Sequence, residues 1–310
     1  MYNAKFLGAL FATFTVVICN GRPPRATVTV HVTDAETRAP VPGALAGVTF
    51  AIPDDRGAAA DVHRTGLTDA HGDFRVTEDT MPYITVGAQK SGYYKTGVNV
   101  DLRPTLKGAY KDDLVVPIVL KPIINPIAMY ARKRARLEIP TVNTPVGFDL
   151  LAFDWLPPYG SGTVPDFVFT LTENNTDPSV KTLSLSFSNG DDGIAPSDVD
   201  PKQGSALRLP RIAPETGYHS QWVRDAGTRY TPKEGRNYFY RIRTVRDGTE
   251  IRSGLYGKIH GDIGIDTINS KTAIVFLTYY LNPDGTRNVE FDPNKNLFKQ
   301  LPPREQVRDP

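Results

Sequence analysis

The sequence predicts an all-β protein built from two β-sandwich domains behind a secretion signal. The 310 residues include 26 Gly and 26 Pro, so turns should be frequent and long helices few. Several segments alternate polar and apolar residues with the two-residue period of a half-buried strand. The chain length suits two domains of ordinary size, each able to bury its own core.

Residues 1–21 are expected to be a signal peptide. Phe6 to Ile18 is an apolar run of signal-peptide length, too short to span a membrane. Cleavage after Gly21 would place Cys19 and Gly21 at the two positions that need small residues. Cys19 is the only cysteine, so no intramolecular disulfide can form. Lipidation of Cys19, as in bacterial lipoproteins, is the alternative, although Ile18 stands where a small residue is expected.

The first domain is expected over residues 22–122 as a small seven-stranded sandwich. Its first strand alternates hydroxyl and valine residues, which places Val28, Val30 and Val32 on one face. Asp34 follows this strand and can accept hydrogen bonds from backbone amides two residues on, which indicates a turn. Later strands are expected at residues 47–52, 73–76, 83–88 and 114–120.

Five short features of this domain occur in a recognisable order. They are the first strand, the turn at Asp34, Pro40-Val41-Pro42-Gly43-Ala44, Thr68-Asp69-Ala70-His71-Gly72-Asp73-Phe74, and Gly92-Tyr93. Together they resemble the carboxypeptidase regulatory-like family over about a third of the chain. The resemblance implies a transthyretin-like (prealbumin-like) sandwich and a non-catalytic accessory role in bacterial exported or surface proteins. We interpret Thr68 and Asp69 as turn-bonding residues and Gly72 as a residue with positive φ.

A linker carrying a basic strip is expected at residues 123–140. The strip comprises Arg132, Lys133, Arg134 and Arg136. One interpretation is an exposed strand whose charges discourage edge pairing. A second is a docking strip for an anionic polymer, a lipid headgroup or a partner protein. A third is a role in folding or proteolytic processing.

The second domain is expected over residues 141–300, with a tail at 301–310, and it resembles no family that we can name. Residues 273–281 are almost continuously apolar, which predicts a strand buried on both faces. Residues 246–249 should form a hairpin turn. Residues 282–285 should turn the chain back into a second hairpin strand at 286–291.

Two kinds of binding residue stand out in the second domain. Trp155, Tyr159 and Trp222 are candidates for stacking on sugar rings, although aromatic residues of sandwiches more often fill the core. A weak calcium site is conceivable because carboxylates are calcium ligands. Its candidate ligands are Asp191, Asp192, Asp198 and Asp200.

These patterns favour a non-catalytic exported protein of the bacterial envelope or extracellular space that acts by binding or scaffolding. A net charge of +2 gives no reason to expect nucleic-acid binding, and no cofactor motif is present. The enzyme after which this family is named is a zinc peptidase, and its zinc site needs a histidine followed by Glu three residues later. No histidine of this sequence is followed by Glu at that spacing. The expected partner is an envelope protein or a cell-wall or extracellular polysaccharide. Membrane association would require lipidation of Cys19. A cell-surface carbohydrate-binding protein is the alternative, followed by a hydrolase with its site in the second domain.

Overall fold

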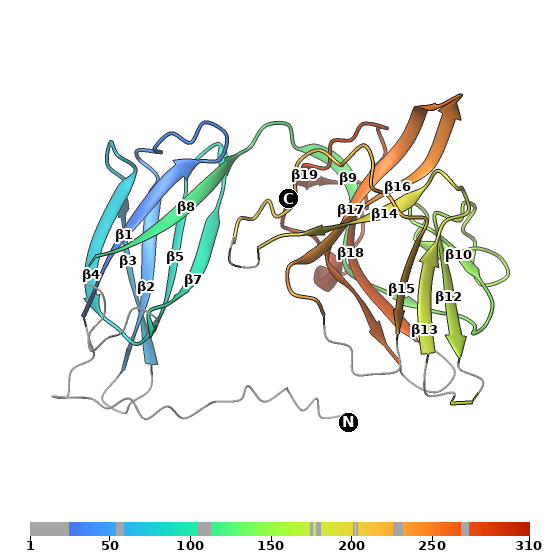
Figure 1. Cartoon of the computed structure of the whole chain (residues 1–310), viewed down its shortest axis with the longest axis horizontal. Helices are drawn as coiled ribbons and strands as arrows, with labels where there is room; N and C mark the ends of the chain where they lie inside the picture. The colour runs from blue at the N-terminus through green and yellow to red at the C-terminus, as the bar shows by residue number, and fades with distance from the viewer. Residues whose placement is uncertain are drawn as a thin grey trace. The chain divides into compact units, whose positions relative to one another are not determined.

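The computed structural model describes residues 25–53, 59–103, 113–173, 176–177, 181–200, 202, 204–225, 232–267 and 273–310. Within these ranges the regular structure is almost entirely β-strand, with a 3-10 turn at Pro303–Glu305 (Figure 1). The predicted all-β fold is therefore confirmed. No helix among the described residues is long and apolar enough to cross a membrane. The expected signal peptide, including Cys19, lies outside the described residues, so cleavage and lipidation stay predictions.

The described chain divides into two compact units. The first contains the described residues of 1–32, 40–87 and 99–118, and the second contains those of 33–39, 88–98 and 119–310. The first sandwich has eight described strands in two sheets of four, where seven strands were expected. One sheet has the order β4-β1-β8-β6 and consists of β4 (Asp73–Asp79), β1 (Arg25–Asp34), β8 (Leu114–Pro122) and β6 (Tyr93–Tyr94). The other has the order β3-β2-β5-β7 and consists of β3 (Ala59–Leu67), β2 (Leu45–Pro53), β5 (Tyr83–Gln89) and β7 (Thr96–Asp101).

Local chemistry of the first sandwich follows the sequence closely. The alternation of β1 buries Val28, Val30 and Val32, as predicted. Thr68 Oγ1 donates to the Val41 carbonyl at 2.7 Å, and Asp69 Oδ1 accepts the His71 amide at 2.8 Å. These two side chains therefore hold the turn before β4.

Gly72 is required by this same turn. Its φ is +78°, and a Cβ at this position would meet the Val32 carbonyl and crowd Pro40. A larger residue would suffer both backbone strain and a steric clash. The expected role of Gly72 is confirmed.

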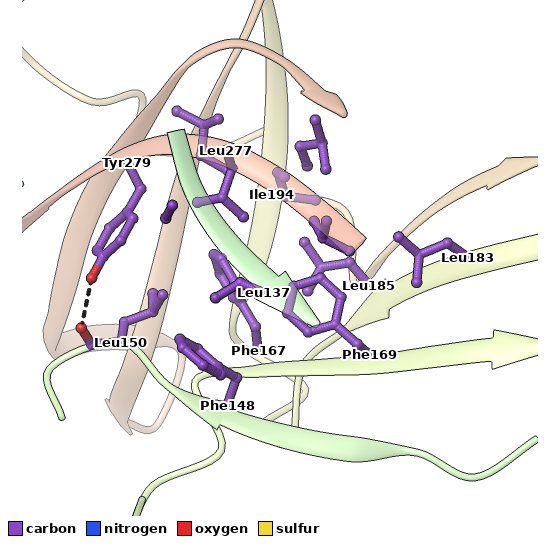
Figure 2. Packing of buried hydrophobic residues seen from close by; sticks show 14 of the residues in the cluster. Leu137, Phe148, Leu150, Phe167, Phe169, Leu183, Leu185, Ile194, Leu277 and Tyr279 are labelled. Carbon is purple, nitrogen blue, oxygen red and sulfur yellow. Dashed lines mark hydrogen bonds between the residues drawn. The ribbon is translucent and has the colours of Figure 1, made fainter. Parts of the chain in front are cut away.

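The second unit contains a second sandwich of two larger sheets. The five-stranded sheet has the order β11-β10-β12-β13-β15 and consists of β11 (Asp154–Trp155), β10 (Val146–Asp149), β12 (Phe167–Glu173), β13 (Lys181–Ser186) and β15 (Gln221–Asp225). The six-stranded sheet has the order β14-β16-β17-β18-β9-β19 and consists of β14 (Gly193–Asp198), β16 (Arg236–Asp247), β17 (Glu250–Asp266), β18 (Ile274–Asn282), β9 (Ile127–Glu138) and β19 (Phe291–Asn296). A core of aliphatic and aromatic side chains fills the space between the sheets (Figure 2). Tyr279 from β18 donates its hydroxyl to the Leu150 carbonyl at 3.0 Å across this core, as Figure 2 shows.

The six-stranded sheet is covered on both faces. Leu277, Tyr279 and Leu281 of β18 point into the core between the sheets, whereas Tyr280 points into a second cluster on the opposite face. Leu209, Ala213, Val289 and Val307 come from segments outside the strands and pack into this second cluster. The prediction that residues 273–281 form a strand buried on both faces is confirmed, because such burial requires an almost continuous apolar run.

Three expectations about the second domain differ from the structure. Residues 127–138, placed in a linker, form β9 between β18 and β19, because Met129, Ala131, Ala135 and Leu137 are buried on its two faces. Residues 286–291 do not return along β18. Instead, Asn282 Nδ2 donates to the Thr286 and Asn288 carbonyls, and the chain then continues into β19, which runs parallel to β9.

The remaining difference concerns the end of the chain. Residues 301–310 were expected to be a tail, but Val307 is only 6% exposed within the second cluster. Tyr280 also donates its hydroxyl to the Asp309 carbonyl at 3.2 Å. This segment is therefore part of the cover over the second face.

Candidate functional site

The basic strip lies on β9 at a β-bulge. Lys133 and Arg134 together oppose the single residue Thr278 of β18. Arg134 has a φ of +48°, and its amide donates to Thr278 Oγ1 at 3.0 Å. The extra residue of a bulge is displaced from the regular pleat, and both of these cationic side chains are exposed.

The four basic residues of the strip have different surroundings. Arg132 is structural: its guanidinium carbon lies 3.5 Å from the Phe153 ring centroid, and its Nε is 3.4 Å from a Glu305 carboxylate oxygen. Arg136 is exposed and lies 3.7 Å from the Glu138 carboxylate. Lys133 and Arg134 form no ion pair with any residue that the structure describes. They are the two members available to an outside partner.

A shallow pocket of about 520 Å³ lies beside this strip, between β19 and the C-terminal segment. Its lining residues are Pro293, Asn294, Asn296, Phe298, Lys299, Leu301, Gln306, Val307 and Arg308. Two of them attach the pocket wall to β9. The Asn296 amide exchanges hydrogen bonds with the Ala131 backbone at 3.2 and 2.8 Å, and the Arg132 guanidinium lies 5.0 Å from the Phe298 ring.

The pocket combines three chemical features. Asn294 and Gln306 supply amide groups, Lys299 and Arg308 supply positive charge, and Phe298, whose ring packs against the main core, forms an apolar part of the wall. Both cations are exposed, and neither has an ion-pair partner within the described ranges. Cations without an ion-pair partner, set beside amide groups, favour an anionic ligand that also forms hydrogen bonds.

The three aromatic candidates for sugar stacking are not grouped with this pocket. Trp155 packs edge-on against Phe148 with ring centroids 4.9 Å apart, and it is half-buried against the main core. Trp222 is also half-buried there, and its Nε1 donates to the Tyr238 hydroxyl at 3.1 Å. Tyr159 alone is exposed, at 43%. Both tryptophans therefore serve the core, as the commoner use of such residues suggests.

The four aspartates of the weak calcium site bind separate protein groups. Asp191 forms an ion pair with Arg246, and Asp198 forms ion pairs with Lys233 and Arg236. Asp192 accepts the amides of Arg243 and Thr244, while Asp200 accepts the Lys202 amide. In the part of the chain that the structure describes, no three His, Cys, Asp or Glu residues gather in a way that could hold a metal ion.

A buried ionic network that the sequence did not reveal lies at the end of the five-stranded sheet. The guanidinium of Arg243 donates to both carboxylate oxygens of Asp166, at 2.8 and 2.9 Å, and to Asp149 at 3.2 Å. Burial raises the pKa of Asp166. Burial acts on Asp149 as well, but backbone amides, including those of Ala152 and Thr163, hold its pKa below the usual value. These carboxylates fix the loop between β10 and β12 to β16.

A second buried polar cluster lies under the cover of the six-stranded sheet. Lys258 is fully buried, and its Nζ lies 4.7 Å from the Tyr280 ring centroid. The Tyr280 hydroxyl is 2.9 Å from His260 Nδ1. Lys258 Nζ and His260 Nε2 are buried without a hydrogen-bond partner among the described residues. Burial lowers the pKa of Lys258 to about 7, and burial together with the nearby Lys258 and Arg208 charges lowers the pKa of His260 well below its usual value.

Comparisons with known proteins show similarity of fold only. No family model matches the chain, and no curated protein matches it. Membership of the carboxypeptidase regulatory-like family therefore stays a prediction. Among solved structures, a proposed carbohydrate-binding protein from Bacteroides uniformis is 12% identical, with a TM-score of 0.22 over 82% of this chain and 98% of that one. The C-terminal domain of the shaft pilin SpaA from Lactobacillus rhamnosus GG is 14% identical, with a TM-score of 0.22 over 32% of this chain and 98% of that one.

Two ring-cleaving enzymes are also similar over part of the chain. 3-Chlorocatechol 1,2-dioxygenase from Rhodococcus opacus is 12% identical, with a TM-score of 0.27 over 34% of this chain. The chain spans 62% of that enzyme and 55% of catechol 1,2-dioxygenase from Acinetobacter, less than two thirds of either. At these scores, none of the four likenesses carries an inference about what this chain binds or catalyses.

Proposed function

We propose that the chain is an exported, non-catalytic bacterial envelope or extracellular protein whose second unit binds an anionic polysaccharide. The observation that carries the proposal is the pocket between β19 and the C-terminal segment. Its cations Lys299 and Arg308 have no counter-ion among the described residues, and amide and aromatic groups line the same hollow. Such a combination suits an anionic saccharide, because the cations attract its carboxylate groups while the amides hydrogen-bond its hydroxyl groups.

The adjoining strip extends the positive surface beyond the pocket. Lys133 and Arg134 project from the bulge in β9, next to the residues that hold the pocket wall. A polymer is a better fit than a small ligand, because the pocket is shallow and further exposed cations follow on β9 directly after the residues that hold its wall. Export is supported by the apolar segment at residues 6–18 and is tested by the cleavage state of the secreted protein.

A partner protein of the envelope is the second candidate. The support is that exposed Lys133, Arg134 and Arg136 could equally meet an acidic protein surface. A pull-down from solubilised envelope proteins should compare the wild type with reversal of these three charges. Arg132 must be kept, because its ion pair and its contact with Phe153 make it part of the packing.

The buried carboxylates Asp149 and Asp166 give no support to the alternative of a hydrolase. Asp149 and Asp166 are close to each other through Arg243, an arrangement that first suggests acid–base chemistry. However, the oxygens of both residues accept hydrogen bonds from Arg243 and from backbone amides. Groups engaged in this way hold a loop in place and are not free to exchange protons with a substrate.

Retention on polymers tests the proposed function. The purified protein is measured against polygalacturonate, neutral dextran and poly-L-glutamate, which separate charge from sugar chemistry. We expect binding to polygalacturonate, and at least a tenfold loss in the double variant Lys299→Glu, Arg308→Glu, since two reversed charges face an anionic ligand. The matched control, Lys95→Glu with Arg252→Glu, makes the same charge change at exposed positions outside the pocket lining. Equal loss in the control, or no binding to any of the polymers, would reject the proposal.

A further inference from the structure

The segments that carry Leu209, Ala213, Val289 and Val307 cover the face of the six-stranded sheet that points away from the main core, and we call them the cover. Its C-terminal part has fewer backbone hydrogen bonds than the other segments. The segments around Ala213 and Val289 are joined to each other by backbone hydrogen bonds, through Arg287 and Arg211. Residues 306–310 belong to no strand, and Tyr280 anchors them by donating to the Asp309 carbonyl. Segments fixed mainly by side-chain contacts open at lower free energy than segments in a sheet.

Lys258 lies beneath this cover in an unusual state for a lysine. Its residue is 0% exposed, and its Nζ has no hydrogen-bond partner within the described chain. The Tyr280 ring centroid lies 4.7 Å from Nζ, and the Tyr280 hydroxyl contacts both His260 and Asp309. Burying an ammonium without an acceptor is unfavourable, so the closed arrangement favours the neutral amine.

The side chains around Lys258 come from both neighbouring strands and from the segments that cover this face. His260 follows on the same strand, and Tyr280 faces it from β18, while its partner on β16 is the apolar Phe239. Four further charged groups shift the pKa of Lys258 or of its neighbours His260 and Tyr280. They are Glu290, Lys121, Arg208 and Asp309. Of these groups, the Glu290 carboxylate attracts the Lys258 ammonium. Its oxygens already accept hydrogen bonds from the Tyr94 hydroxyl and from the Ile124 and Asn125 amides. Lys258 therefore has no dedicated counter-ion in the described surroundings.

We propose that Lys258 is a buried proton-operated switch for the C-terminal cover, residues 306–310. When Nζ takes up a proton, the ammonium must reach water, and the weakest part of the cover loosens. When Nζ releases the proton, the neutral amine can be buried next to the Tyr280 ring, and residues 306–310 pack over it again. Tyr280 is the link, since its ring lies over Nζ and its hydroxyl binds the Asp309 carbonyl.

Loosening the cover would also change the pocket. Gln306, Val307 and Arg308 are both cover residues and pocket-lining residues. Acidification would therefore weaken ligand capture, a consequence that rests on the proposed polysaccharide function. The switch itself does not depend on that function and can be tested without any ligand.

Hydrogen exchange of the whole protein tests the switch. Protection of residues 306–310, corrected for the intrinsic pH dependence of exchange, should be about tenfold lower at pH 6 than at pH 8, because an opened segment restores an ordinary amine that binds a proton more tightly. In Lys258→Met most of this difference should disappear, and the remainder should be the part that His260 contributes, because opening would also restore the lowered pKa of that imidazole. The control Lys95→Met, at an exposed position, should behave as the wild type does.

Two results would overturn the switch. One is a pH effect on residues 306–310 that persists unchanged in Lys258→Met, because another group would then be responsible. The other comes from the wild type alone, which keeps the test valid if the variant does not fold. Titration of the lysine side chains by nuclear magnetic resonance should show one amine that titrates near neutral pH, and titration of every lysine near its ordinary value would reject the proposal. Polygalacturonate retention at the two pH values then shows separately whether the cover controls the pocket.

Discussion

Arg243 of β16 binds both carboxylate oxygens of Asp166 at 2.8 and 2.9 Å. Asp166 is completely buried as a side chain, whereas Arg243 is 28% exposed. A planar guanidinium suits this two-point contact, which a lysine could not reproduce. Arg243 also adopts a φ of +54° at an irregular point in the pairing of β16 with β17, and this turns its side chain towards the loop after β10.

Removing one partner of this pair should be strongly destabilising. We expect Arg243→Met to lower the free energy of unfolding by about 3–5 kcal/mol, because Asp166 would be left buried without its counter-ion. Urea denaturation measures the change. Arg246→Met is a suitable control, since its ion pair with Asp191 is partly exposed and should contribute at most about 1 kcal/mol. Similar losses in both variants would show that burial of Asp166 does not determine the effect.

Gly257 of β17 should not tolerate even a methyl group. A Cβ there would overlap the Tyr240 ring and the Tyr280 carbonyl, and these two groups are themselves joined by a hydrogen bond of 2.9 Å. We expect Gly257→Ala to destabilise the protein by about 1–3 kcal/mol, as overpacking of a core does. Gly190→Ala, where a Cβ would meet nothing within 4 Å, should change the melting temperature little. A neutral result for Gly257→Ala would mean that β17 can shift relative to β18.

The stability of the protein should rise with pH above neutrality because of Lys258. Burial lowers its pKa in the folded state to about 7, whereas an unfolded lysine keeps its ordinary value of 10.5. The unfolded chain therefore binds more protons in this window, and unfolding becomes harder as the pH increases from about 7 towards 10. The gain should be on the order of 2–3 kcal/mol between pH 7 and 9. Urea midpoints at several pH values measure the slope, and Lys258→Met should remove most of it.

The two tryptophans should affect stability more than ligand binding. Trp155→Ala is expected to cost about 2–4 kcal/mol, because its ring packs edge-on against Phe148 and Phe169. Trp222→Phe should cost about 1 kcal/mol through the lost hydrogen bond to Tyr238. Tyr159→Ala, at an exposed site, should be nearly neutral. Loss of polygalacturonate retention in a folded Tyr159→Ala variant would instead place a sugar contact on this ring.

Local patterns allowed much of the fold to be predicted from the sequence. The alternation of β1, the turn at Asp69 and Gly72, and the double burial of β18 all depend on neighbouring residues, so the sequence contains their cause. The hairpin turn at residues 246–249 is of the same kind, with Gly248 at a φ of +61°.

The pocket could not be predicted, because it depends on contacts between distant segments. Asn296 lies in a polar stretch of sequence, yet its amide binds the backbone of Ala131, 165 residues away. In the same way, residues 301–310 carry mostly polar side chains and prolines, and only Val307 and its place in the second cluster explain their order. No feature of the sequence indicated that Lys258 is buried, since a lysine inside an alternating strand is usually exposed.

At the bulge in β9 the number of residues is constrained, but the identity of the side chains is not. Met129 and Ala131 face one core while Ala135 and Leu137 face the other, and Lys133 and Arg134 absorb the change between them. Deleting one residue here would reverse the facing of half the strand, so its length is constrained by both cores. The identity of the Lys133 side chain is constrained by neither. Homologous chains could therefore vary the charge at this site freely, and so change ligand preference, without any cost to folding.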